Sequence, residues 1–156
     1  MDAATAFHQH CLQDRAGDAP HLPAWSDDDW RHLFEHARQV NLKSGEVLIR
    51  AGDAGGALYF VVKGALEVSS PRSDALGGLS RELPGSVIGE ISFFDGLPRS
   101  ATVWATAPTE LLKLDAESWR AFAARYPKQA VDMLFALGRV LAFRIRRGEE
   151  RARHHH

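Results

Sequence analysis

The stretch Gly85-Ser-Val-Ile-Gly-Glu90-Ile-Ser-Phe-Phe-Asp95-Gly-Leu-Pro-Arg99-Ser-Ala-Thr-Val-Trp104 is the segment that we expect the rest of the chain to hold in place. Gly85 and Gly89 allow the backbone to turn and allow a ligand to approach closely. Arg99 supplies a planar fork of donors that matches phosphate oxygens. A carboxylate repels phosphate, so Glu90 is better suited to accept a hydrogen bond from a sugar hydroxyl. A nucleotide carries both groups.

The middle of this stretch predicts a short helical turn. Phe93 and Phe94 are expected to anchor it, and the amides of Ile91 and Ser92 at its start would point outward and suit an anion. The alternative interpretation is a surface turn with a solvated ion pair, which contributes little to stability. The order of the whole pattern, with apolar residues between the polar ones, favours the ligand site.

The segment IGEISFFDGLPRSATVWA resembles the phosphate-binding cassette of cyclic nucleotide-binding domains. Such domains occur in catabolite activator-type bacterial regulators, regulatory subunits of cyclic-nucleotide-dependent kinases and cyclic-nucleotide-gated channels. The family's Gly-Glu pair falls on Gly89-Glu90, its arginine on Arg99 and its small pair on Ser100-Ala101. The spacing of nine from Glu90 to Arg99 resembles the kinase and channel branch.

The resemblance implies roles for these residues. The glutamate would bind the ribose 2′-hydroxyl, the arginine would bind the cyclic phosphate, and backbone amides would complete the phosphate site. No catalytic residue, metal ligand or cofactor is expected, and the ligand would be cGMP or cAMP. The expected ligand-binding residues are Val87, Gly89, Glu90, Ile91, Ser92, Arg99, Ser100 and Ala101.

Composition limits the fold and the compartment. The chain has 156 residues, 45% of them hydrophobic, which is enough for one domain with its own core and too few for two. A net charge of −1 offers no general attraction to nucleic acid or membranes. Cys11 is the only cysteine, so a reducing, cytoplasmic setting is expected. Neither a secretory signal nor a membrane span is expected.

The chain is expected to divide into three parts. Residues 1–24 mix Ala, His, Gln, Asp, Gly and Pro without a period and predict a flexible N-terminal arm. Residues 25–153 form the domain, and residues 154–156 are interpreted as the remnant of a purification tag.

The first helix of the domain is predicted after Ser26, which precedes three aspartates and is a typical N-cap. It contains His32-Leu-Phe-Glu35-His36, which formally matches the inverted zincin pattern. A metalloprotease would need a third protein ligand, and no later segment offers a matching acidic helix. We therefore expect these two histidines to belong to an ordinary helix face.

Residues 38–114 change to a period of two with recurring turn signals. Short strands at this spacing predict a mainly β fold with flanking α-helices, a β-jelly-roll or double-stranded β-helix, with an N-terminal helix and C-terminal helices. The segment GEVLIRAGDAGGALYFVVKGALEV also resembles the opening strands of the cyclic nucleotide-binding β-roll. Residues 69–80 are expected to form an exposed hairpin tip, and Tyr59 to Val62 are expected to be mostly core.

Two C-terminal helices are predicted. The first begins after Asp115 as N-cap and ends before Pro127, and the second runs from about Pro127 to Arg151. The second helix has apolar residues over more than one stripe, which indicates packing on a partner subunit or a neighbouring domain. In the family this helix closes over the base, here somewhere between Leu141 and Arg147. Its basic end fits a solvated helix face better than a nucleic-acid arm.

Three hypotheses about function remain on the sequence alone: a cyclic nucleotide sensor, a protein-interaction domain of the same fold without a ligand, and an enzyme. The sensor is favoured because both Glu90 and Arg99 are present. Its expected partners are the nucleotide, an output domain or partner protein reached through the C-terminal helix, and a second copy in a homodimer. No membrane or nucleic acid is expected to bind this segment.

The choice of base depends on Ser100. A hydroxyl directly after the arginine can bond the guanine amino group when the base is syn, and family members that prefer cGMP often carry Thr or Ser there. Members of the catabolite activator branch that bind cAMP also have Ser. Ser100 therefore favours cGMP slightly over cAMP.

Overall fold

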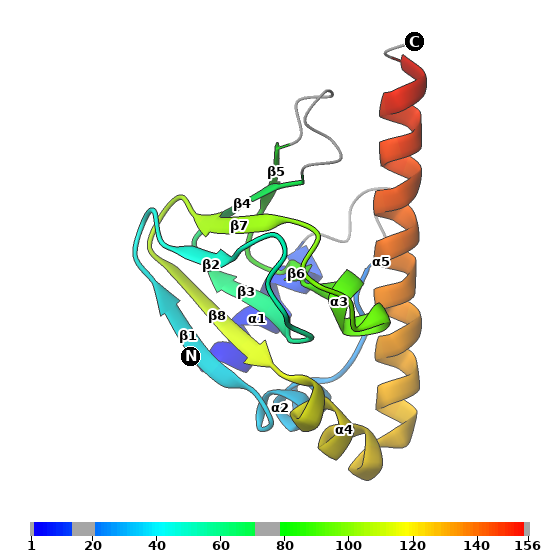
Figure 1. Cartoon of the computed structure of the whole chain (residues 1–156). Coiled ribbons are helices and arrows are strands. Elements are labelled where there is room, and N and C mark those ends of the chain that lie inside the picture. The colour runs from blue at the N-terminus through cyan, green and yellow to red at the C-terminus, as the bar shows by residue number, and fades with distance from the viewer. Residues whose placement is uncertain (1, 14–20, 71–78, 155–156) are drawn as a thin grey trace.

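Strands in two antiparallel sheets form the centre of the molecule (Figure 1). The computed structural model describes residues 2–13, 21–70 and 79–154. The first sheet has the order β1-β8-β3-β6, with β1 at Arg38–Leu42, β8 at Thr109–Leu114, β3 at Leu58–Lys63 and β6 at Val87–Ile88. The second has the order β2-β7-β4-β5, with β2 at Val47–Ile49, β7 at Thr102–Ala105, β4 at Leu66–Ser69 and β5 at Leu79–Glu82. The mainly β architecture with flanking helices is as predicted.

Strand β3 separates the two hydrophobic cores. Its side chains alternate between the two faces of the sheet. Phe60 and Val62 pack into the core on the helix side, whereas Tyr59 and Val61 pack between the two sheets. Because both faces are covered, β3 is nearly continuously apolar, which agrees with the expectation that these residues are mostly core. The predicted hairpin tip falls largely on residues 71–78, which lie outside the described residues.

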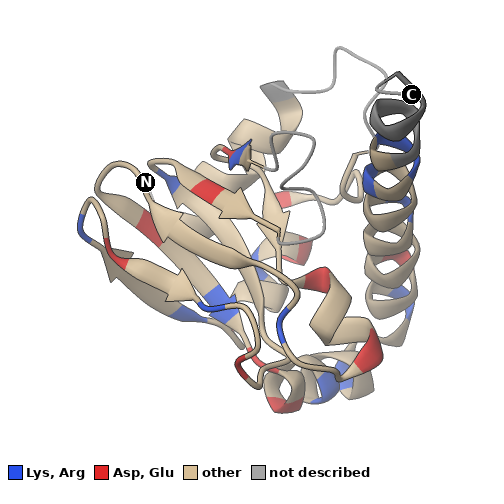
Figure 2. Ribbon diagram, turned by 45° about the horizontal axis from the view of Figure 1, so that its top comes forward, with Lys and Arg blue, Asp and Glu red and all other residues tan. Residues whose placement is uncertain are grey.

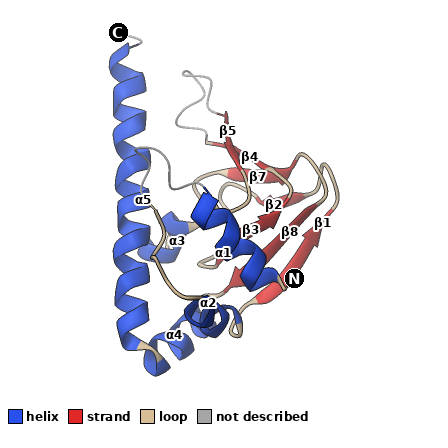
Figure 3. Cartoon of the chain, turned by 180° about the vertical axis from the view of Figure 1, so that it is seen from behind, coloured by secondary structure: helices blue, strands red, loops and turns tan. Residues whose placement is uncertain are grey.

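The expectation of a flexible N-terminal arm is wrong for residues 3–13. They form helix α1 (Ala3–Gln13), which lies across the back of the roll in Figure 3. Phe7 is fully buried, and its ring meets those of Trp30, Phe34 and Phe60 edge-on. One large aromatic side chain in a well-packed position is sufficient to dock a short helix, although the helix lacks a regular apolar period.

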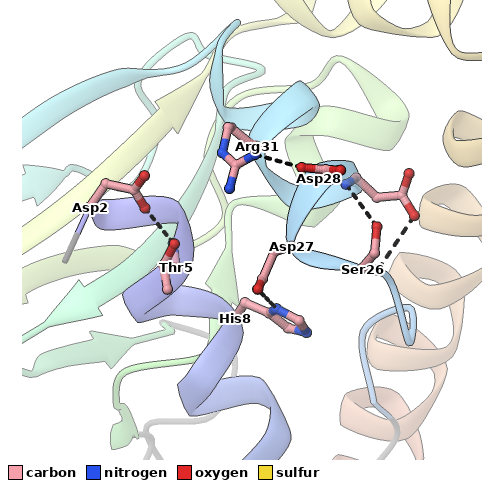
Figure 4. Close-up of polar contacts among 8 residues, drawn as sticks. Asp2, Thr5, His8, Ser26, Asp27, Asp28 and Arg31 are labelled. Carbon is pink, nitrogen blue, oxygen red and sulfur yellow. Dashed lines mark hydrogen bonds and ion pairs between the residues drawn. The ribbon is translucent and has the colours of Figure 1, made fainter.

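Figure 4 shows polar contacts of α1 and of the helix that follows it, including one ion pair between the two helices. The amide of Thr5 donates to Asp2 at the start of α1, and His8 pairs with Asp27 at the start of α2 (Asp27–Phe34). Ser26 caps α2 as predicted, because its hydroxyl accepts from the amide of Asp29 and the Asp29 carboxylate accepts in return from the Ser26 amide.

The two histidines of the zincin-like pattern serve in packing. The ring of His32 stacks on Tyr126 with centroids 4.6 Å apart, and Nδ1 of His36 donates to the carbonyl oxygen of His32. Within the described part of the chain, no group of three or more His, Cys, Asp or Glu side chains is placed to hold a metal ion.

The C-terminal helices are α4 (Ala116–Arg125), capped by Asp115 as predicted, and α5 (Pro127–His154). Figure 1 shows α5 as a long helix beside the roll that extends past its sheets, and Figure 2 shows several Lys and Arg positions along it. Its inner stripe is buried at Ala130, Met133 and Leu137, and its outer side exposes Val131 and Phe135. None of the described helices is long and apolar enough to cross a membrane. Of the predicted tag remnant, residues 155–156 lie outside the described residues.

Candidate functional site

Helix α3 (Glu90–Asp95) is the short helical turn that the sequence predicts, and it lies between the roll and α5 (Figure 1). Gly89 is its N-cap, with a φ of 91° that other residues rarely adopt. No side chain caps the first amides of α3, so these donors are available at its N-terminus. Phe93 anchors the turn against Trp119, whereas Phe94 is exposed, so only one of the two phenylalanines acts as the expected anchor.

A cavity of about 830 Å³ opens beside α3. Its lining comes from α3 and the loops beside it, strands β2 and β4 to β7 of the roll, the later turns of α5, and the N-terminal residues Cys11, His21 and Leu22. All eight residues that the sequence analysis expects to bind a ligand line this cavity: Val87, Gly89, Glu90, Ile91, Ser92, Arg99, Ser100 and Ala101. The structure thus brings together residues from both ends of the predicted cassette.

Arg99 lies in the floor of this cavity and is only 8% exposed. Its Nη1 donates to the carbonyl oxygen of Gly89 at 3.2 Å, and its Nη2 donates to that of Ala57 at 2.9 Å. Burial lowers the pKa of the Arg99 guanidinium, with only partial compensation from Tyr59 and Glu90. A desolvated cation held by neutral carbonyls is a favourable site for an anion.

Glu90 is 4% exposed and begins α3 beside Arg99. Its Oε1 accepts a hydrogen bond from Nη1 of Arg144 on α5 at 2.6 Å. The carboxylate is therefore oriented by the C-terminal helix.

Ser92 presents an unusual polar group. Its hydroxyl is buried and has no hydrogen-bond partner within the described part of the chain, although the residue lines the cavity. Buried side-chain polar groups are hydrogen-bonded in the large majority of cases, so an unpartnered hydroxyl in a cavity lining is a candidate contact for a bound molecule.

The remaining predicted residues differ in exposure. Val87 is buried beneath the cavity, Ala101 is partly buried, and Ser100 is exposed at the rim. The lining also has apolar side chains, among them Val103 from the roll and Phe143 and Ile145 from α5. A lining with both charged and apolar side chains suits a ligand with an anionic group and a flat ring.

Sequence reasoning did not single out Arg144 and Glu82. Arg144 lies within the range Leu141 to Arg147 that was expected to face the ligand, and its Nη2 donates to Glu82 Oε1 of β5 at 3.1 Å. A signal was present in the sequence: Arg144 continues the buried stripe of Met133, Leu137 and Val140 at helical spacing. A charge in an apolar stripe indicates a buried partner.

Comparisons with known proteins agree with this geometry. Residues 39–126 match the family model described as the cyclic nucleotide-binding domain. A cyclic nucleotide-gated potassium channel of Mesorhizobium japonicum is 33% identical over 93 residues, which span 60% of this chain and 24% of the channel. A cyclic AMP receptor protein of Thermus thermophilus is 37% identical over 101 residues, which span 62% of this chain and 45% of that protein.

The fold has close counterparts among solved structures. A cyclic nucleotide-binding domain from Methylobacillus flagellatus superposes with a TM-score of 0.75 at 24% identity, covering 97% of this chain and 85% of that one. The match spans a quarter to a half of the length of the two curated relatives described above. Because the family model covers more than half of the chain, the chain belongs to the cyclic nucleotide-binding domain family.

Proposed function

We propose that this domain is a sensor that binds a cyclic nucleotide, cGMP or cAMP, in the 830 Å³ cavity and passes the signal on through α5. The observation that carries the proposal is the presence of two buried, opposite charges, Arg99 and Glu90, in the lining of one cavity. The family match and the cyclic nucleotide-gated channel among the relatives support the class of ligand, and the cyclic AMP receptor protein supports cAMP as one candidate.

Each part of a cyclic nucleotide has a partner in this proposal. The phosphate lies at Arg99 and the first amides of α3, where a charge-assisted fork and a helix N-terminus both favour an anion. The ribose 2′-hydroxyl donates to Glu90, the hydroxyl of Ser92 gains a partner, and the base lies toward Phe143 and Ile145.

Ser100 supports a slight preference for cGMP, because its exposed hydroxyl at the cavity rim is able to accept from the guanine amino group of a syn base. Competition binding with both nucleotides tests this preference. We expect Ser100→Ala to weaken cGMP more than cAMP, and an equal effect on both would contradict the role of Ser100.

Transmission of the signal rests on α5. A ligand that binds the form with α5 closed over the cavity more tightly than the open form shifts the population toward the closed form, by no more than that difference in affinity. The exposed apolar side chains Val131 and Phe135 suit contact with an output domain, a partner protein or a second copy of the chain. Cytoplasmic location stays a prediction from the single cysteine.

Calorimetric titration with cAMP and with cGMP tests the proposed function. Saturable binding of at least one is expected. Arg99→Ala should cost about 2–5 kcal/mol of binding free energy, which is ~30-fold or more in Kd. Arg38→Ala is the matched control, because Arg38 is exposed on β1 and lies outside the cavity lining.

Two results would contradict the proposal: no heat with either nucleotide, or wild-type affinity in Arg99→Ala. Both would favour a protein-interaction domain of the same fold.

A further inference from the structure

Arg144 ties α5 to three other elements at once. Its Nη1 donates to Oε1 of Glu90 on α3 at 2.6 Å, and its Nη2 donates to Oε1 of Glu82 on β5 at 3.1 Å and to the carbonyl oxygen of Val87 on β6 at 3.0 Å. These acceptors lie more than fifty positions away in the sequence. One guanidinium therefore links this part of α5 to the cavity wall.

The charges explain why the arginine is required there. The side chains of Glu82 and Glu90 are 15% and 5% exposed, so both carboxylates are largely withdrawn from water and share one cation. Burial raises the pKa of the Glu82 carboxyl group in spite of Arg144. Burial alone would lower the pKa of Arg144, but the charges of Glu90 and Glu82 together outweigh it and raise that pKa. Removing Arg144 would leave two acids of like charge facing each other in a poorly solvated wall.

Arg144 binds Glu90 through one carboxylate oxygen. Within the described residues, its hydrogen bond to the Glu90 side chain goes to Oε1 and not to Oε2. Nη2, the other arm of the fork, donates to Glu82 and to the carbonyl oxygen of Val87. Arg144 thereby orients the Glu90 carboxylate and leaves Oε2 without a hydrogen bond from the arginine.

We propose that Arg144 and Glu82 are positioning residues for Glu90, so that recognition of a ribose 2′-hydroxyl depends on α5 being docked on the cavity wall. This inference rests on the proposed function of the cavity. Coupling between the two is reciprocal: the docked helix strengthens the hydroxyl contact, and a ligand with that hydroxyl stabilises the docked helix by the same free energy.

The test compares 3′,5′-cyclic AMP with its 2′-deoxy analogue, and the corresponding pair of guanine nucleotides, on each variant. A hydrogen bond to a charged group typically contributes about 1.5–3 kcal/mol, so wild type should prefer the ribose form by ~10-fold to ~100-fold. Arg144→Gln should lower this preference at least several-fold, with little further loss for the deoxy ligand. Arg144→Lys and Glu82→Gln should lower it less, because each keeps one arm of the network.

The ratio of the two affinities distinguishes positioning from general damage. A variant that merely disturbs the fold weakens both ligands equally and leaves the ratio unchanged, and that result for Arg144→Gln would overturn the proposal. Arg146→Ala is the matched control, because Arg146 is exposed on the same helix outside the cavity lining. It should keep the wild-type ratio.

A second readout needs no nucleotide. Arg144→Gln and Glu82→Gln should both speed hydrogen exchange of the α5 amides around residues 137–147, whereas Arg146→Ala should not. Wild-type exchange rates in both Arg144→Gln and Glu82→Gln would contradict the role of these residues in docking α5. Failure of the proposed function is distinguishable, because wild type would then bind neither the ribose nor the deoxy nucleotide. If wild type binds and the ratio does not respond to Arg144, only the positioning inference fails.

Discussion

The carbonyl oxygen of Gly89 accepts a hydrogen bond from Nη1 of Arg99 at 3.2 Å, and a Cβ on Gly89 would lie 2.8 Å from that same nitrogen. The same Cβ would lie 2.6 Å from the carbonyl oxygen of Ala57, the second acceptor of the Arg99 fork. Gly89 thus holds the arginine and leaves the space that the arginine occupies.

We therefore predict that Gly89→Ala disables the site. The new methyl group would displace the Arg99 fork, and alanine at a φ of 91° is strained in addition. Nucleotide affinity should fall as in Arg99→Ala, measured by calorimetry. Gly96→Ala is the matched control at the other end of α3, because its φ is 69° but a Cβ there would meet open space. It should lose only about 1–2 kcal/mol of unfolding free energy from backbone strain, and equal binding losses in both variants would contradict the steric explanation.

Helix α1 should contribute strongly to stability. Phe7 is fully buried among aromatic rings, so Phe7→Ala should lower the unfolding free energy by about 3–5 kcal/mol. Leu12→Ala, at a side chain that is 53% exposed on the same helix, should change it by less than about 0.5 kcal/mol. Urea unfolding of both variants measures the difference, and similar small effects would indicate that α1 is not docked.

The N-cap of α4 should give a pH-dependent contribution. The amide of Ser118 donates to the Asp115 carboxylate and holds its pKa below the ordinary value of 3.8. When folding lowers the pKa of a carboxyl group, its stabilisation is fully present at pH values above the pKa in the unfolded state. The stabilisation is lost as the pH falls through the pKa in the folded state. Asp115→Ala should cost about 1 kcal/mol near neutral pH, and less as the pH falls below 3.8.

Asp115→Asn serves as the control for that titration. Asparagine is as good an N-cap as aspartate and carries no titrating proton. Its unfolding free energy relative to the alanine variant should not depend on pH, whereas that of wild type should. A pH-dependent difference between the asparagine and alanine variants would contradict the assignment to the carboxylate.

Glu82 should show the opposite dependence. Burial raises the pKa of its carboxyl group above the ordinary value of 4.5, against smaller opposing effects of Arg144 and the Ser86 hydroxyl. At pH values between the pKa of Glu82 in the unfolded state and its pKa in the folded state, Glu82 is protonated in the native state and ionised in the unfolded state. The contribution of this protonated carboxyl group to stability is therefore lost as the pH rises through that range. The unfolding free energy of wild type relative to Glu82→Gln should therefore decline as pH increases from below 4.5. An unchanged or rising difference would show that the buried acid is not strained.

Much of the fold could be predicted because its signals are local. A period of two marks the strands, Ser26 and Asp115 cap the helices that follow them, and the glycines and arginine of the cassette lie within fifteen positions of one another. Short-range hydrogen bonds and alternating burial act over a few residues, so the sequence carries them directly. Helix α1 was not predicted, because its docking depends on one side chain, Phe7. The aromatic rings that Phe7 packs against come from distant parts of the chain, so the sequence alone does not show this contact.

The sequence by itself determined which residues make up the candidate site, with Glu90, Ser92, Arg99 and Gly89 all within one short segment. Only the tertiary structure decided how the site connects to the rest of the molecule. Arg144 lies 54 residues from Glu90 and 62 residues from Glu82, and no local rule pairs them. Their contact forms because α5 packs its apolar stripe on the roll and thereby brings a cation to two largely buried acids, whose ionised forms are costly to bury without a partner.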